Sequence, residues 1–183
     1  MNSIARFLFC TLWGWKITGK VIVPKFVVAV IPHTSNWDFI VGLLVRAAGN
    51  INHCRYVGKN SLFVFPFGYL FKALGGIPVD RSKSTNFVDS VVALYPQHDK
   101  LGICLSPEGT RSHVTKLKTG FYYIAKNANV PIILCKFDWK NKIVDYAEPF
   151  YLTDNMEADM DYILNYFQGV AGKNYPFELK TWR

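Results

Sequence analysis

Apolar and polar residues follow one another along the chain in blocks that are typical of strands and helices. Four apolar runs, most of them rich in β-branched residues, predict strands at residues 26–31, 77–79, 102–106 and 130–137. Helical patterning predicts helices at residues 38–48, 61–74, 86–95, 119–127 and 156–169. Strands that alternate with helices indicate an α/β fold, in which a mostly parallel central sheet is flanked by helices.

The length of 183 residues suits one domain with its own hydrophobic core. Half of the residues are apolar and 16% are aromatic, which is more than such a core usually needs. We therefore expect some apolar surface to face a membrane or a lipid. The predicted organisation is a single domain over residues 21–183, preceded by a helical segment over residues 1–20.

The first 20 residues combine Phe, Leu and Trp with the basic residues Arg6, Lys16 and Lys20. Their apolar stretch, residues 7–15, is far shorter than the roughly 20 residues that a membrane-spanning helix needs. No small-x-small cleavage site follows, so a signal peptide is not expected. Two alternatives stay open: an amphipathic helix in the interface of an anionic membrane, or a helix packed on the domain's own core.

The net charge of +8 predicts an anionic partner, which could be nucleic acid, anionic lipid or a phosphorylated substrate. Nucleic acid is disfavoured because the aromatic residues gather in apolar clusters such as "LFVFPFGYLF", residues 62–71, and are not interleaved with basic residues. The four cysteines lie far apart without the spacing of metal ligands, so we expect free thiols and no metal site.

Three polar clusters follow predicted strands: "PHTSNWD" at 32–38, "DRS" at 80–82 and "PEGTRS" at 107–112. In sheets of this kind, ligands bind outside the carboxyl ends of the strands. The three clusters are therefore expected to meet at one edge of the sheet, although they are dispersed along the chain.

His33 and Asp38 can form a general base and its orienting carboxylate. An aspartate that accepts a hydrogen bond from one ring nitrogen fixes the tautomer and leaves the other nitrogen to take a proton. The alternative is two polar residues that share a loop by chance. Ser35, Ser106 and Cys104 lack a motif that would activate them as nucleophiles, so we expect the attacking group to belong to the substrate.

Arg81 and Arg111 both follow predicted strand ends, where a guanidinium suits a phosphate or carboxylate. The alternative for each is a structural ion pair, with Asp80 or Glu108 as the neighbouring acid. Gly109 in "PEGTR" allows a tight turn that brings backbone N–H groups toward a ligand.

Four blocks of the chain resemble the ordered motifs of the glycerophospholipid acyltransferases, which include 1-acylglycerol-3-phosphate acyltransferase. The blocks are "HTSNWD" (33–38), "GGIPVDR" (75–81), "SPEGTRS" (106–112) and "VPIIL" (130–134), and the resemblance covers roughly residues 26–137. It implies an O-acyltransferase of phospholipid biosynthesis. The enzyme would move a fatty acyl group from acyl-CoA or acyl carrier protein to the hydroxyl of a lysophospholipid such as 1-acylglycerol-3-phosphate, without a metal or other cofactor.

The resemblance also implies residue roles. His33 would remove the proton of the acceptor hydroxyl, and Asp38 would orient His33. Arg81 would bind the acceptor's anion, and Lys118 would add to this binding. The acceptor pocket would be shaped by Glu108, Gly109, Thr110 and Arg111. The protein is expected to lie peripherally or monotopically on the cytoplasmic face of a membrane, and the expected membrane is the bacterial inner membrane.

Several positions depart from the family pattern and leave the acceptor open. Ser106 stands where an aromatic residue is common, "VPIIL" runs into Cys135 where a proline is usual, and an N-terminal apolar hairpin is lacking. Another lyso-lipid, such as an acyl-amino-acid lipid, is the alternative acceptor. A non-catalytic membrane-binding or nucleic-acid-binding domain is the alternative of another class, which the presence of both His33 and Asp38 disfavours.

Overall fold

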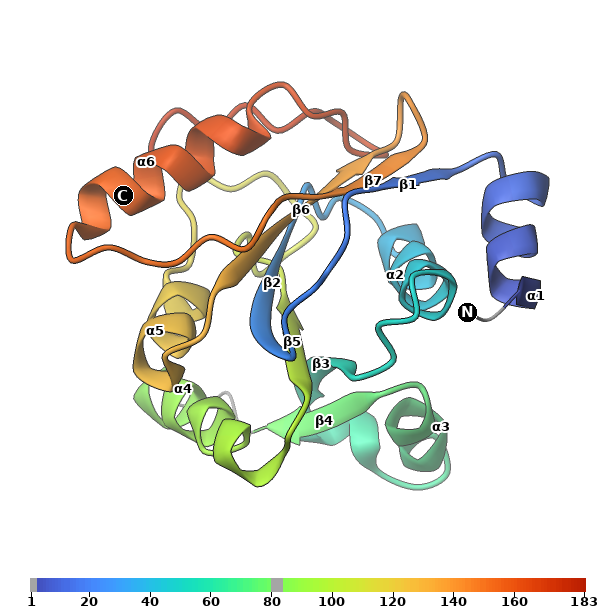
Figure 1. The fold of residues 1–183 in the computed structure, drawn as a ribbon, viewed down its shortest axis with the longest axis horizontal. Coiled ribbons are helices and arrows are strands. Elements are labelled where there is room, and N and C mark those ends of the chain that lie inside the picture. The colour runs from blue at the N-terminus through green and yellow to red at the C-terminus, as the bar shows by residue number, and fades with distance from the viewer. Residues whose placement is uncertain (1–2, 80–83) are drawn as a thin grey trace.

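A seven-stranded sheet runs through the molecule and separates two groups of helices (Figure 1). The computed structural model describes residues 3–79 and 84–183. The strand order is β1-β7-β6-β2-β5-β3-β4. The strands are β1 (Lys16–Thr18), β2 (Lys25–Ile31), β3 (Cys54–Lys59), β4 (Gly76–Val79), β5 (Leu101–Leu105), β6 (Ile132–Asp138) and β7 (Ile143–Tyr146).

The sheet is mostly parallel, as the sequence predicts. Strands β4, β3, β5, β2 and β6 run in one direction, whereas β7 pairs antiparallel with β6 and parallel with β1. Strand β2 lies in the middle, with Val27 opposite Ile103 of β5 and Ile132 of β6. Helices cover both faces of β2, which explains why its sequence is an unbroken apolar run instead of an alternating one.

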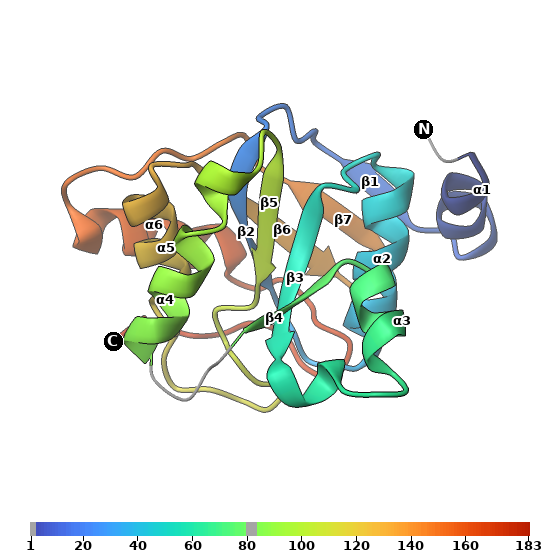
Figure 2. The same cartoon turned by 90° about the horizontal axis from the view of Figure 1, so that it is seen from below.

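Helices cover the two faces of the sheet, as Figure 2 shows. Helices α4, α5 and α6 pack on one face, and α2 packs on the other with the N-terminal segment. Helix α3 lies beside the edge strand β4. The helices are α1 (Ser3–Arg6), α2 (Trp37–Ala48), α3 (Gly68–Ala73), α4 (Ser84–Val92), α5 (Gly120–Ala128) and α6 (Met156–Phe167).

One predicted helix is wrong in its extent. The helix expected over residues 61–74 is divided into a 3₁₀ turn, Asn60–Phe63, and the short helix α3, which begins only at Gly68. Pro66 lies between the two pieces, and a proline lacks the backbone N–H that a helix interior needs. The intervening residues Phe65 and Phe67 are exposed.

The N-terminal segment combines features of both alternatives left open by its sequence. It continues from α1 into a π-helical turn, Phe7–Leu12, and is followed by β1. Ala5 and Phe9 are buried in the cluster that α2 forms with the sheet. Exposed apolar side chains on the same segment are those of Ile4, Phe7, Leu8 and Leu12. Among residues 3–79 and 84–183, no helix has the length and apolar character needed to cross a bilayer.

The contact between β2 and β5 gives a test of the packing. A Cβ atom at Gly102 would lie 2.3 Å from Cε2 of Phe26, whose side chain is fully buried. Gly102→Ala should therefore lower the free energy of unfolding by about 1–3 kcal/mol, because the ring has no free space to enter. Denaturant titration measures this change.

Gly42→Ala is the matched control, because it adds the same methyl group inside α2. The nearest atom to its Cβ is Cζ of Phe137 at 3.9 Å, so the variant should be as stable as the wild type or more stable by up to about 1 kcal/mol. Equal stabilities of Gly102→Ala and the wild type would contradict the packing described.

Candidate active site

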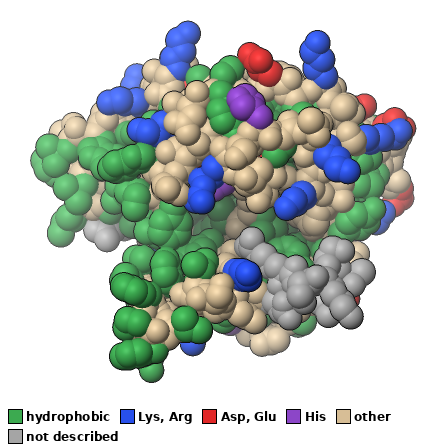
Figure 3. Space-filling model, turned by 180° about the vertical axis from the view of Figure 1, so that it is seen from behind, with side chains coloured by type: hydrophobic (Ala, Val, Ile, Leu, Met, Phe, Trp, Pro, Cys, Tyr) green, Lys and Arg blue, Asp and Glu red, His purple; other side chains and the backbone are tan. Residues whose placement is uncertain are grey.

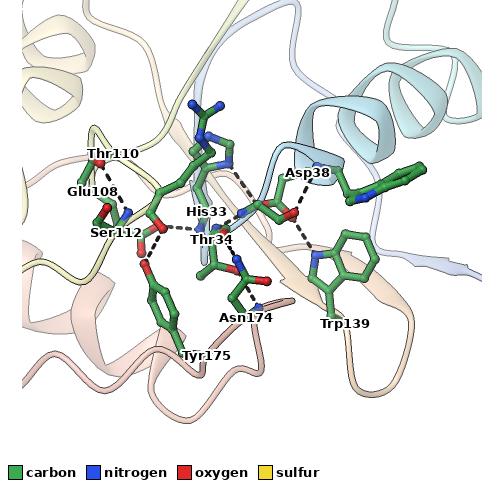
Figure 4. A network of polar contacts seen from close by, with 12 residues as sticks. His33, Thr34, Asp38, Glu108, Thr110, Ser112, Trp139, Asn174 and Tyr175 are labelled. Atoms are coloured by element: carbon green, nitrogen blue, oxygen red, sulfur yellow. Dashed lines mark hydrogen bonds and ion pairs between the residues drawn. The ribbon is translucent and has the colours of Figure 1, made fainter.

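Two of the three predicted polar clusters meet at the carboxyl ends of the central strands. The loop that holds His33 follows β2, and the loop that holds Glu108 follows β5, the direct neighbour of β2 (Figure 4). The third cluster, with Arg81, lies outside the described residues. Strand β4, which leads to it, runs parallel to these strands at the edge of the sheet.

His33 and Asp38 lie side by side as a potential base and its orienter. His33 Nδ1 is 3.2 Å from Oδ2 of Asp38. The side chain of Asp38 is 2% exposed and that of His33 is 26% exposed, so the carboxylate is buried while the ring is open to a ligand. Because Nδ1 faces Asp38, Nε2 is the nitrogen left for a substrate proton.

The Asp38 carboxylate is held on both oxygens. Backbone N–H groups of Thr34 and Ser35 each donate a hydrogen bond to Oδ2, at 2.8 Å. The indole Nε1–H of Trp139 donates to Oδ1 at 2.7 Å. Asp38 also lies in the first turn of α2, where the helix dipole favours a negative charge. These contacts give both oxygens of the buried carboxylate hydrogen-bond partners and fix its direction.

Glu108 supports His33 from the other side. Its carboxylate Oε2 accepts a hydrogen bond of 2.5 Å from the backbone N–H of His33. Burial raises the pKa of the Glu108 carboxyl to about 7; the charge of Asp38 adds to the rise, and the bond from His33 opposes it. Glu108 and Arg111 do not form the ion pair that was the alternative for this arginine. Among the described residues, the ion pairs are His33 with Asp38 and Glu157 with Arg183.

The remaining predicted residues gather next to His33. Gly109, Thr110, Arg111 and Lys118 line the same cavity as His33. Gly109 has φ +66°, and a Cβ there would lie 2.7 Å from Cδ, Cε and Nζ of Lys118, so the lysine side chain lies directly over this turn. The backbone N–H of Lys118 donates to the Pro107 carbonyl, which ties the two ends of the loop together.

The cavity beside His33 has a volume of about 1170 Å³, and its lining is largely apolar. His33, Arg111 and Lys118 line it where strands β2 and β5 end. The cavity extends between α2 and strands β3 and β5, where apolar residues such as Phe39, Leu43 and Phe71 line it together with the basic residues Arg46, Arg55 and Lys59. Figure 3 shows the hollowed side of the molecule, with apolar side chains and with lysines and arginines around it.

Comparison with known proteins assigns the family. A family model described as Acyltransferase matches residues 15–137. The chain belongs to this family, the glycerophospholipid acyltransferases. The matched range contains His33, Asp38 and the whole 107–112 loop, so the resemblance seen in the sequence is confirmed at the level of the family. No curated protein and no solved structure matched the chain.

Further residues hold the loops of the candidate site, and these lie beyond the matched range. Asn174 donates from its backbone N–H to Oγ1 of Thr34 and from Nδ2 to the Thr34 carbonyl. Tyr175 donates from its hydroxyl to the Arg111 carbonyl at 2.8 Å. The C-terminal loop thus holds both the His33 loop and the Arg111 loop. Sequence reasoning missed these residues and Trp139, although Trp139 directly follows a central strand and the strand-end rule could have found it.

Residues that could hold a metal ion do not cluster within the described ranges, since no three His, Cys, Asp or Glu side chains come together there. That the reaction needs no metal or cofactor stays a prediction.

The buried Glu108 carboxyl should make stability depend on pH. Its pKa is about 7 in the folded protein and 4.5 ordinarily, so the folded state holds this proton more tightly than the unfolded state. The contribution is complete below about pH 4.5 and is lost as the pH rises through about 7. Relative to Glu108→Gln, the wild type should lose on the order of 3 kcal/mol of unfolding free energy between about pH 4.5 and pH 8.

Denaturant unfolding of both proteins across this range measures the difference. Glu108→Gln is the suitable reference because its amide oxygen can still accept the bond from His33 but cannot ionise. Parallel pH curves for the two proteins would show that Glu108 titrates normally.

Proposed function

We propose that the protein transfers a fatty acyl group from the thioester of acyl-CoA or acyl carrier protein to the hydroxyl of a lysophospholipid such as 1-acylglycerol-3-phosphate, as a step of phospholipid biosynthesis. The observation that carries this proposal is the position of His33. It lies against a buried, fully hydrogen-bonded carboxylate, and it lines a largely apolar cavity that also carries basic side chains.

In this proposal the acceptor hydroxyl attacks the thioester directly. Nε2 of His33 takes the hydroxyl proton while the oxygen forms a bond to the thioester carbonyl carbon. The carbon–sulfur bond then breaks, and the departing thiolate receives the proton from His33. Asp38 keeps Nδ1 of His33 protonated throughout and stabilises the imidazolium that forms between the two steps.

The basic and apolar side chains of the cavity suit the two parts of such substrates. Arg111 and Lys118 provide positive charge near His33 for a phosphate or another anion of the acceptor. The apolar side chains between α2 and strands β3 and β5 suit a hydrocarbon chain, and Arg46, Arg55 and Lys59 add positive charge in the same region. Arg81 lies outside the described residues, and its role in binding the acceptor's anion stays a prediction.

Peripheral attachment to the cytoplasmic face of a membrane is part of the proposal, because both substrates carry lipid chains. Two exposed apolar groups support it. One comprises Ile4, Phe7, Leu8 and Leu12 of the N-terminal segment, and the other comprises Leu62, Val64, Phe65, Phe67 and Leu70 around α3. Apolar side chains of this size are rarely exposed in such groups unless they meet a partner or a lipid surface.

Replacement of the dyad tests the mechanism. His33→Ala should lower kcat by about 10²–10⁴-fold, because the hydroxyl loses its base. Asp38→Asn should be nearly as damaging, since an amide no longer fixes the required tautomer. The assay is mass spectrometry of the lipids that purified protein forms from a panel of acyl thioesters and lyso-lipids. His98→Ala, at an exposed histidine, is the matched control and should keep wild-type activity.

Two outcomes would count against this account in different ways. A wild-type protein that acylates no lyso-lipid of the panel would refute the proposed substrate class. A folded His33→Ala protein that keeps more than a tenth of wild-type kcat would refute the role of His33.

Membrane attachment is tested by sedimentation with vesicles that contain anionic lipid. Two double variants each remove two exposed apolar anchors and should each lower the bound fraction of the protein. One combines Phe7→Ser and Leu12→Ser, and the other combines Phe65→Ser and Phe67→Ser. Added salt should release part of the wild-type protein by screening its positive charge. Tyr151→Ser, at another exposed aromatic residue, should bind as the wild type does. Unchanged binding of both double variants would place the attachment elsewhere.

A further inference from the structure

The two oxygens of the Asp38 carboxylate have different partners. Oδ2 lies against His33 and accepts the bonds from the backbone of Thr34 and Ser35. Oδ1 accepts its bond from the indole of Trp139, at 2.7 Å. Asp38 is almost wholly buried, so solvent is poorly placed to replace that donor. The indole N–H therefore holds Oδ1 in place, while the three contacts to Oδ2 hold the other oxygen.

The indole is itself held in one orientation. The backbone N–H of Trp139 donates to the Ala171 carbonyl at 2.8 Å. The ring of Trp15 packs edge-on against the indole, with centroids 5.0 Å apart, and Nζ of Lys173 lies 4.4 Å from the centroid of the Trp139 ring. Segments from both ends of the chain thus fix the direction in which Nε1–H points.

Trp139 contacts Asp38 from outside the cavity. It is not among the residues that line the cavity, whereas His33 and Asp38 are. In Figure 4 its indole nitrogen points to the carboxylate of Asp38. Its bond to Asp38 is therefore the described contact through which the indole N–H can act on His33.

We infer that Trp139 is a positioning residue of the acyltransferase, whose indole N–H fixes Asp38 and thereby the ring of His33 in the orientation that takes the acceptor proton. This inference rests on the proposed function. A change in the donor alone should then slow the chemical step without weakening the binding of either substrate.

Three replacements at position 139 separate the donor from the ring. In 3-benzothienylalanine the indole N–H is replaced by sulfur with nearly the same shape, and Trp139→Phe keeps an aromatic ring without a donor. Trp139→His keeps an N–H at the corresponding position of a five-membered ring. The benzothienylalanine and Phe variants should lower kcat by about ten- to a hundred-fold and leave the KM values for thioester and lyso-lipid within about two-fold of the wild type. The His variant should recover part of the lost kcat. Trp182→Phe is the control and should keep wild-type kcat.

A double-mutant cycle with Asp38→Ala shows whether the effect passes through the carboxylate. In the Asp38→Ala background, loss of the indole N–H should cause no further fall in kcat, because no carboxylate remains to be oriented. A benzothienylalanine protein within about two-fold of wild-type kcat would overturn the inference. A fall of equal size in both backgrounds would also overturn it, since it would assign Trp139 a merely structural role.

The outcomes also separate this inference from the proposed function. A wild-type protein without acyl transfer to any lyso-lipid would overturn both together. An active wild type whose kcat does not respond to loss of the donor would overturn the role of Trp139 alone.

Discussion

The buried carboxylate of Asp38 is the interaction on which the rest of the site depends. An anion removed from water is stable only if hydrogen-bond donors surround it. Asp38 obtains these donors from the backbone of its own loop, from His33 and from Trp139. The loop after β2 must therefore follow a path that brings its N–H groups to Asp38, and Asp38 connects this loop to Trp139, the residue after β6. The same contacts aim His33 at the cavity.

The parallel sheet makes this arrangement possible, because its central strands deliver their following loops to one edge. Strands β5 and β6 flank β2 on either side, so the loops that carry Glu108 and Trp139 reach the His33 loop from opposite directions. Glu108 then holds the backbone of His33, while Trp139 holds its partner Asp38. The C-terminal loop adds Asn174 over this assembly. Most of the cavity beyond is apolar, as a lipid substrate requires.

The sequence predicts the parts of the structure that have strong local signals. Strands β2, β5 and β6 are apolar runs, and α2 has a clear apolar face, so their positions were confirmed within a few residues. Strands β1, β3 and β7 were missed because each mixes charged with apolar residues, and β1 and β7 are also short. His33 and Asp38 belong to one local motif and could be found. Trp139 and Asn174 lie 101 and 140 positions from their partners, beyond any local motif. The position of Trp139 directly after β6 was a signal that could have been used, whereas Asn174 follows no strand of the sheet.

The central claim is that His33 activates a hydroxyl of the substrate and that the protein itself is never acylated. The most direct test is a single-turnover reaction of the wild type with an acyl-CoA and a lyso-lipid, quenched rapidly and followed by intact-protein and lipid mass spectrometry. The account predicts that the new ester appears as fast as the thioester disappears, with no acylated protein at any time. An acyl adduct on Ser35, Ser106 or Cys104 that forms and decays at the turnover rate would contradict it.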